Sequence, residues 1–313
     1  MATKKATKKS TAAKAASTKS ASSRKATATT VAEKPVLTKS AATSGQVIKK
    51  LRLPLNIPNI MLAEALGTFV LTLVAVASIA LGELFVGLAF AVIVLAIGGI
   101  SGSHLNPAVT FGFWTMRKIN WATGLMYWAA QFVGSLLALA VMFLVSNNTM
   151  SMNFSSIALF DWSLFAVELV AAAVFMFGIT AAVTRTSLGV TSRAVVIGLS
   201  LTAALVAGSS LLTASKEGAY AAYQDEADKI AQNADAEGTE QPKTPRALLI
   251  RGVVANPAVA LAVKEVSEDQ LMGGQAPAGE SLANRFTLDL ILGTLIGAAL
   301  GGNLYLLIAR RSE

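Results

Sequence analysis

Six apolar stretches, each near the ~20 residues that an α-helix needs to cross a bilayer, constrain this chain more than any other feature. They cover residues 58–81, 84–100, 120–145, 162–184, 194–214 and 286–309. Only 14% of the residues are charged, whereas a soluble globular chain carries about 25%. Too few charges remain to cover a water-exposed surface. The sequence therefore predicts an all-α membrane protein that crosses the bilayer six times.

The positive charge is concentrated in a tail, residues 1–52, which holds 13 of the 26 Lys and Arg residues and one of the 18 acidic residues. The tail is built mainly from Lys, Ala, Thr and Ser and has no apolar run, so we expect it to be disordered. We interpret it as a solvated segment that fixes topology. Contact with anionic lipid stays an alternative, and no nucleic-acid partner is expected. The remaining residues, 53–313, form the predicted membrane domain.

The distribution of Lys and Arg between the spans predicts the orientation. If six spans alternate, one side of the membrane receives the tail, Arg117, Lys118, Arg185, Arg193, Arg310 and Arg311. The other side receives residues 146–161, which lack Lys and Arg, and the largely acidic residues 216–245. Cytoplasmic loops carry the excess of Lys and Arg. We therefore expect a protein of the plasma or inner membrane. Both of its termini should lie in the cytoplasm.

Two apolar segments, residues 101–116 and 252–264, are too short to cross, and each contains Asn-Pro-Ala. The motif residues are Asn106, Pro107, Ala108, Asn256, Pro257 and Ala258. Asn is a favoured helix N-cap and Pro a favoured first helical residue, so one copy would indicate only a helix start. Two copies, each following an equivalent span, are much more specific than a single helix start.

The chain consists of two similar halves, a first repeat at about residues 58–146 and a second at about 162–309. The matching features are Glu64 with Glu168, residues 86–99 with 197–210, residues 104–110 with 254–260, and Gly134 with Gly297. Each half has three spans, so the second half must be inverted in the membrane. Interrupted segments at matching positions of an inverted repeat indicate the substrate path.

Two half-helices entering from opposite faces would meet N-terminus to N-terminus. Irregular backbone at that depth is tolerated only where it is buried or lines a water-filled cavity. The converging N-termini would place partial positive charge in that cavity, and Asn106 and Asn256 would offer amide donors to a passing oxygen. This arrangement opposes cations and protons.

With these motifs the sequence resembles the major intrinsic protein family, the aquaporins and aquaglyceroporins. The matching stretches are AEALGTF (63–69), SGSHLNPAVTFG (101–112), AAQFVGSLLA (129–138), the span around Gly198, ANPA (255–258) and LGTLIGAALGGNLY (292–305). The resemblance implies a right-handed bundle of six tilted helices plus two re-entrant half-helices. It also implies a homotetramer with one pore in each subunit.

The resemblance further implies roles for individual residues. Glu64 and Glu168 would accept hydrogen bonds from backbone N–H groups of the two re-entrant loops, and His104 would help to hold the first loop. The selectivity filter of the family maps onto Val86, Leu205, Val253 and Val259. The family has an Arg at the last of these positions, so a filter of four aliphatic side chains is a departure. Glycerol facilitators usually carry Asp where this chain has Ala260, so a standard glycerol channel is not supported.

Two further features lie near the predicted pore mouth. Arg251 is five residues before Asn256 and either leans toward the mouth or is solvated. Residues 215–247 form a polar insertion on the predicted outer side, where Ala219, Tyr223, Ile230 and Ala231 suggest a weak amphipathic helix. This insertion is interpreted as a lid, a contact between subunits or a tolerated surface loop.

The predicted function is a passive channel for water or other small uncharged solutes. Alternatives are a channel for larger or less polar neutral solutes, a secondary transporter, and a non-conducting structural membrane protein. The chain has no cysteine and one histidine, which excludes disulfides and multi-histidine metal sites. No nucleophile–base pair is recognisable, so we expect no enzyme activity, catalytic residue, metal or cofactor.

Overall fold

A computed structural model of the chain describes residues 56–146, 152–232, 242–274 and 282–310. Residues 50–313 form one compact unit. The expected disordered tail, residues 1–52, lies outside the described residues, as does part of the polar insertion, residues 233–241.

The six predicted spans are confirmed as six helices that are long and apolar enough to cross a membrane. They are α1 (Ile57–Leu81), α2 (Glu83–Ser101), α4 (Trp121–Ser146), α5 (Trp162–Thr184), α6 (Val190–Gln232) and α9 (Leu288–Ala309). The shorter elements are α3 (Pro107–Thr115), η1 (Arg246–Leu249), α7 (Pro257–Ala260) and α8 (Glu268–Leu271). Within the described ranges the chain contains no β-strand, only an isolated bridge between Lys264 and Asn284.

In each half of the bundle, one pair of helices packs through an equivalent glycine. Helix α1 packs on α4, where a Cβ atom on Gly134 would collide with the carbonyl oxygen of Ala65. Helix α5 packs on α9, where a Cβ atom on Gly297 would collide with the carbonyl oxygen of Leu169. Ala65 and Leu169 directly follow the two matched glutamates in the sequence. The same backbone approach therefore occurs in both halves.

Helices α2 and α6 join the two halves. Gly87 and Gly198 face each other across this contact, and a Cβ atom on either would collide with the carbonyl oxygen of the other. The main apolar core lies beside this contact and includes residues of α2, α5, α6 and both re-entrant segments. The pore candidates therefore lie where the two halves meet.

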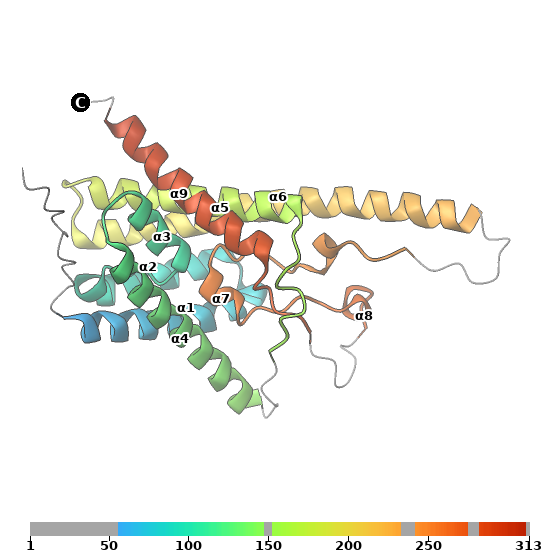
Figure 1. The fold of residues 1–313 in the computed structure, drawn as a ribbon, viewed down its shortest axis with the longest axis horizontal. Coiled ribbons are helices and arrows are strands. Elements are labelled where there is room, and N and C mark those ends of the chain that lie inside the picture. The colour runs from blue at the N-terminus through green and yellow to red at the C-terminus, as the bar shows by residue number, and fades with distance from the viewer. Residues whose placement is uncertain (1–55, 147–151, 233–241, 275–281, 311–313) are drawn as a thin grey trace, which may run out of the picture. The chain divides into compact units, whose positions relative to one another are not determined.

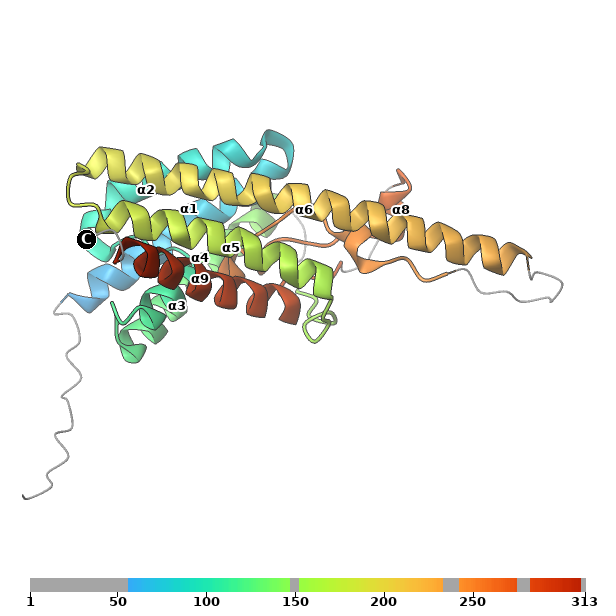
Figure 2. The same cartoon turned by 90° about the horizontal axis from the view of Figure 1, so that it is seen from above.

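Helix α6 is longer than the predicted span of residues 194–214. It continues without a break through the first part of the polar insertion to Gln232, and it extends past the neighbouring helices (Figures 1 and 2). This stretch is rich in Ala, Glu, Lys and Gln and contains no proline, so it favours helix. Lys229 and Asp225, one turn apart on its exposed surface, form an ion pair at 2.5 Å.

The second re-entrant helix is shorter than the first. Helix α3 has nine residues, whereas α7 has four. After α7 the chain turns into an extended segment, because Asn284 Nδ2 donates to the carbonyl oxygen of Leu261 and the backbone N–H of Arg285 donates to that of Val263. Asn284 and Arg285, which were not singled out in the sequence, thus bind carbonyl groups just after α7.

Candidate functional site

Asn106 and Asn256 cap the two re-entrant helices in the same way. Oδ1 of Asn106 accepts a hydrogen bond from Ala108 N at 2.8 Å, and Oδ1 of Asn256 accepts one from Ala258 N at 3.0 Å. A proline follows each asparagine at a helix position whose N–H has no partner within a helix. The remaining motif residues are all buried: Pro107, Ala108, Pro257 and Ala258.

Each asparagine also binds the opposite loop. Asn106 Nδ2 donates to the carbonyl oxygen of Ala255 at 2.8 Å, and Asn256 Nδ2 donates to that of Leu105 at 3.0 Å. The two helix N-termini therefore face each other. An amide nitrogen carries two hydrogens, and within the described residues one of them has a partner at each asparagine.

The residue before each asparagine has a left-handed backbone, with φ of 54° at Leu105 and 51° at Ala255. Non-glycine residues in this region cost roughly 1–2 kcal/mol. A buried carboxylate stabilises each turn: Glu64 accepts from Leu105 N at 2.7 Å, and Glu168 accepts from Ala255 N at 2.8 Å. The other oxygen of each carboxylate accepts from the preceding backbone N–H. The two predicted loop-supporting glutamates thus occupy equivalent places.

In the first half, neutral groups complete the environment of Glu64. Ser101 Oγ donates to it at 2.7 Å, and Gln131 Nε2 donates to it at 3.0 Å. Both side chains are buried. The carboxylate therefore has side-chain and backbone donors and no cationic partner within the described residues.

His104, the third predicted support, is enclosed by aromatic rings. Its ring centroid lies 4.7 Å from that of Phe113 and 4.4 Å from that of Tyr127. Its Nδ1 lies 3.1 Å from Thr110 Oγ1 in α3. The imidazole thus fixes the loop to the helix that follows it, while its backbone N–H donates to Glu64.

In the second half, Glu168 faces a buried arginine that the sequence analysis missed. Arg285 is only 2% exposed, and its guanidinium lies 3.5 Å from Glu168 and 2.9 Å from Asp289. It also donates to Thr287 Oγ1 at 2.8 Å. A signal existed, since Arg285 and Asp289 are four residues apart at the start of an apolar span. Burial of a charge at such a place requires a partner of opposite sign.

A second arginine extends this cluster toward the surface. Arg246 in η1 forms ion pairs with Asp289 and with Glu265, the latter at 2.9 Å. Burial lowers the pKa of Arg246, but the charges of Asp289 and Glu265 outweigh burial and raise this pKa overall. The residues on both sides of the second pore loop are therefore tied to α5 and α9 by alternating charges, here called the ionic cluster: Glu168, Arg285, Asp289, Arg246 and Glu265.

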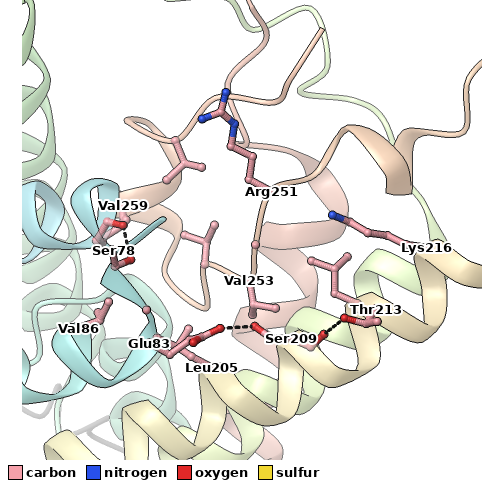
Figure 3. Close-up of a pocket in the computed structure, with 16 residues that line it drawn as sticks. Ser78, Glu83, Val86, Leu205, Ser209, Thr213, Lys216, Arg251, Val253 and Val259 are labelled. Carbon is pink, nitrogen blue, oxygen red and sulfur yellow. Dashed lines mark hydrogen bonds between the residues drawn. The ribbon is translucent and has the colours of Figure 1, made fainter. Parts of the chain in front are cut away.

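The four predicted filter residues meet at a cavity of about 350 Å³, here called the wide cavity. Val86 comes from α2, Leu205 from α6, Val259 from α7, and Val253 from the loop before it (Figure 3). The charged residues of the cavity wall are Glu83, Lys216 and Arg251. Arg251 is exposed and its guanidinium points away from the valines (Figure 3), so it does not take the place of a filter arginine.

A second cavity of about 20 Å³, here called the narrow cavity, continues from the wide one to Asn106 and Asn256. The two cavities share the lining residues Ala75, Val86, Leu205, Val254 and Val259. The narrow cavity is also lined by Leu71, Phe90, Phe175 and Leu201, which the sequence analysis did not single out. The structure therefore places the filter residues and both asparagines around two adjoining cavities.

Comparison with known proteins shows which sequences this chain resembles. A sequence model of the family described as "Major intrinsic protein" matches residues 50–219, more than half of the chain. A glycerol uptake facilitator protein-like 6 of Lactiplantibacillus plantarum is 41% identical over 86 residues, which cover 25% of this chain and 40% of the relative. Aquaporin Z of Photorhabdus laumondii is 40% identical over 98 residues, 27% of this chain and 42% of the relative.

These alignments are partial, since the chain spans less than half of the length of either curated relative. Among solved structures, the aquaglyceroporin of Plasmodium falciparum aligns with 80% of this chain and 93% of its own. The identity is 18% and the TM-score is 0.46.

Proposed function

Because the chain belongs to the major intrinsic protein family, we propose that residues 53–313 form a passive channel for water and small uncharged solutes, with its pore centred on Asn106 and Asn256. The observation that carries the proposal is the pair of adjoining cavities that share lining residues and reach these asparagines. Relatives named as aquaporins and as a glycerol uptake facilitator support a role in transport of this kind.

The restriction to uncharged solutes is argued from the path itself. The N-termini of α3 and α7 converge on it and contribute partial positive charge. The paired asparagines add N–H donors, which favour a solute oxygen. The surrounding filter positions are aliphatic, so an ion would lose its hydration without compensation.

Flux measurements in proteoliposomes test the proposal. Stopped-flow light scattering would follow water, glycerol, urea and ammonia, with protein-free vesicles as control. A channel gives a low activation energy, no saturation and no dependence on a counter-ion. Saturable flux coupled to an ion gradient would instead favour a secondary transporter. No flux of any solute from correctly folded protein would favour a structural role.

The aliphatic filter favours a second candidate, a channel for neutral solutes larger or less polar than water. Water passing Val86, Leu205 and Val259 gives up hydrogen bonds, which costs on the order of 1–3 kcal/mol per unmet group. Val259→Arg should shift selectivity toward water, and Val259→Met controls for side-chain length without charge. Rapid water flux with exclusion of larger solutes by the unmodified protein would reject this candidate.

The proposed channel also has an orientation and an assembly. We propose a multi-pass protein of the plasma or inner membrane with both termini in the cytoplasm, supported by the Lys and Arg distribution. Protease added to intact cells should cut within residues 215–247 and spare the tail; the reverse pattern would reject the orientation. A homotetramer is proposed from the family resemblance and is tested by chemical cross-linking in native membranes.

A further inference from the structure

Helix α7, which carries the filter residue Val259, is a single turn (Figure 1). A single turn fixes several backbone angles for few hydrogen bonds, so it is not stable by itself. The side chain of Val259 has no donor or acceptor that could tie this turn to its surroundings. The position of Val259 therefore depends on contacts that other residues make with the two ends of α7.

Arg285 is linked to the backbone at both ends of this turn. After α7, its backbone N–H donates to the carbonyl oxygen of Val263 at 2.9 Å. Before α7, its guanidinium lies 3.5 Å from the carboxylate of Glu168. That carboxylate accepts from the backbone N–H of Val254 at 3.2 Å and from that of Ala255 at 2.8 Å. One residue thus connects the two sides of α7.

The guanidinium of Arg285 is itself restrained. The residue is only 2% exposed. Its Nη1 donates to Asp289 at 2.9 Å and to Thr287 Oγ1 at 2.8 Å, and this hydroxyl donates to Asp289 at 2.6 Å. Asp289 is held in turn by its ion pair with Arg246. Because a guanidinium is planar and donates in fixed directions, these contacts orient Arg285 as well as neutralise it.

The segment held in this way forms part of the wall of the wide cavity. Val254 and Val263 both line this cavity, and Val259 lies between them in the sequence. The other filter residues on this wall include Val86 and Leu205, which belong to the long helices α2 and α6. Movement of the loop segment relative to these helices would change the width of the cavity at the filter.

The contacts at the inner end of α7 do not replace this support. Asn256 Nδ2 donates to the carbonyl oxygen of Leu105 at 3.0 Å, and Ser135 Oγ donates to that of Ala258 at 2.5 Å. None of these four residues lines the wide cavity. They fix the start of the turn beside the narrow cavity.

We propose that Arg285 is a positioning residue for the aliphatic filter: it holds the segment from Val254 to Val263 in place and thereby determines which neutral solutes the filter admits. In the described part of the chain its side chain lines neither cavity, so it acts through the loop and not on the solute. Without the guanidinium, Glu168 loses its link to Asp289 of α9. The segment then occupies a wider range of positions, and large neutral solutes are excluded less well. This inference rests on the proposed channel function.

The ratio of glycerol to water permeability distinguishes positioning from stability. Both fluxes scale with the number of folded channels in a vesicle, so a variant that only folds less well lowers both and leaves the ratio unchanged. Full-length protein in vesicles would be assayed by stopped-flow light scattering. We expect Arg285→Met to raise the ratio by at least about threefold, since the space of one methylene in a pocket discriminates by about 10–200-fold. Arg285→Lys keeps the charge and should raise the ratio less.

Thr287→Val covers the case in which Arg285→Met does not fold. It keeps the shape of the buried side chain but removes the hydroxyl that binds Arg285 and Asp289, so we expect a smaller rise in the ratio. Gln131→Met is the matched control, because it removes a donor to the equivalent carboxylate, Glu64, in the first half. It should leave the ratio unchanged, since the first re-entrant loop supplies no residue to the wall of the wide cavity.

The outcomes separate this inference from the channel proposal. If the unmodified protein conducts neither water nor glycerol, both fail. If it conducts, but the folded Arg285 and Thr287 variants keep the unmodified ratio, the positioning role is rejected and the channel proposal stands. A rise of equal size in Gln131→Met would also reject the positioning role, because the effect would then come from loosening of the whole bundle.

Discussion

The two halves of this protein stabilise their re-entrant loops with an equivalent carboxylate, whose other partners differ between the halves. Glu64 accepts hydrogen bonds from Ser101 and Gln131 in addition to the loop. Glu168 makes the equivalent contacts to the second loop but faces the guanidinium of Arg285. One support is a set of neutral donors and the other is an ionic cluster.

The difference between the halves indicates which contacts both loops require. Leu105 and Ala255 have nearly the same strained backbone, so each half needs an acceptor for the N–H groups of its turn. The other partners of the carboxylate differ between the two halves. The second loop is followed by a one-turn helix and a long polar connection, and the ionic cluster ties both of its sides to α5 and α9.

The largest effect on stability is expected at Arg285, which pairs with Glu168 in the second half. Arg285→Met would leave the carboxylates of Glu168 and Asp289 buried without their common cation, at a cost of about 3–5 kcal/mol. Gln131→Met in the first half removes a neutral donor and should cost about 1–3 kcal/mol. Thermal unfolding in detergent, followed by circular dichroism, compares the two.

Arg285→Lys serves as the control for this pair, because it keeps the charge and should recover part of the stability. Equal unfolding temperatures for the Arg285→Met and Gln131→Met variants would show that the ionic cluster is no more important than its neutral counterpart.

The sequence predicted the parts of the fold that have strong periodic or repeated signals. Apolar length alone located the six spans, since a bilayer requires about 20 such residues. The doubled Asn-Pro-Ala motif predicted that Asn106 and Asn256 would cap helices. The repeat predicted that Glu64 and Glu168 would lie at equivalent places. These features depend on local propensity or on the repeat, which are both visible in one sequence.

Other features could not be predicted, for identifiable reasons. Arg285 stands at the start of an apolar span, where a charge is usually solvated, and its partner Glu168 is distant in sequence. Phe90 and Phe175 lie in apolar helices, where a buried ring and a lipid-facing ring cannot be told apart by composition.

A second prediction concerns Asn106 and Asn256, whose contacts are equivalent in the two halves. Asn106→Asp and Asn256→Asp each replace a donor to a carbonyl oxygen by a carboxylate oxygen, with an expected cost of about 1–3 kcal/mol. Each also adds negative charge to the path. Water and solute flux should fall, or a cation leak should appear, to the same extent in both variants. Proteoliposome flux and a sodium-leak assay measure this.

Because the two asparagines have equivalent contacts, a marked difference in flux or leak between these variants would show that the two residues are not functionally equivalent. Unchanged flux without a leak in a correctly inserted double variant would remove both residues from the mechanism.

A third and smaller effect is expected at the outer end of the ionic cluster. Glu265→Gln keeps an oxygen that accepts from Arg246 but removes the charge, so it should cost about 1 kcal/mol. Asp225→Asn, which removes the ion pair with exposed Lys229, is the matched control and should cost at most about 0.5 kcal/mol. Both are measured as shifts in unfolding temperature.

The raised pKa of Arg246 predicts how the stability loss caused by Glu265→Gln depends on pH. Its folded-state pKa is raised, so the stabilisation is complete below the ordinary arginine pKa and is lost only as pH rises through the raised value. The difference between Glu265→Gln and the unmodified protein should therefore not disappear on raising pH from about 7 to 9. Its disappearance in that range would show that Arg246 is not the partner that matters.

The smallest effect concerns the strained residues themselves. Ala255→Gly removes a left-handed strain of about 1–2 kcal/mol but adds about 0.4–1 kcal/mol of chain entropy to the unfolded state. The net change in stability should be within about 1 kcal/mol. Leu105→Gly gains the same relief, yet it also removes a fully buried side chain that packs over Gly67, which should cost several kcal/mol in total, as leucine truncations do (about 2–5 kcal/mol). Unfolding temperature and water flux should thus change little for the first variant and fall for the second. If Ala255→Gly were instead strongly destabilising, Glu168 and its ionic cluster would not be sufficient to fix the second turn, and the methyl group of Ala255 would have to contribute to its packing.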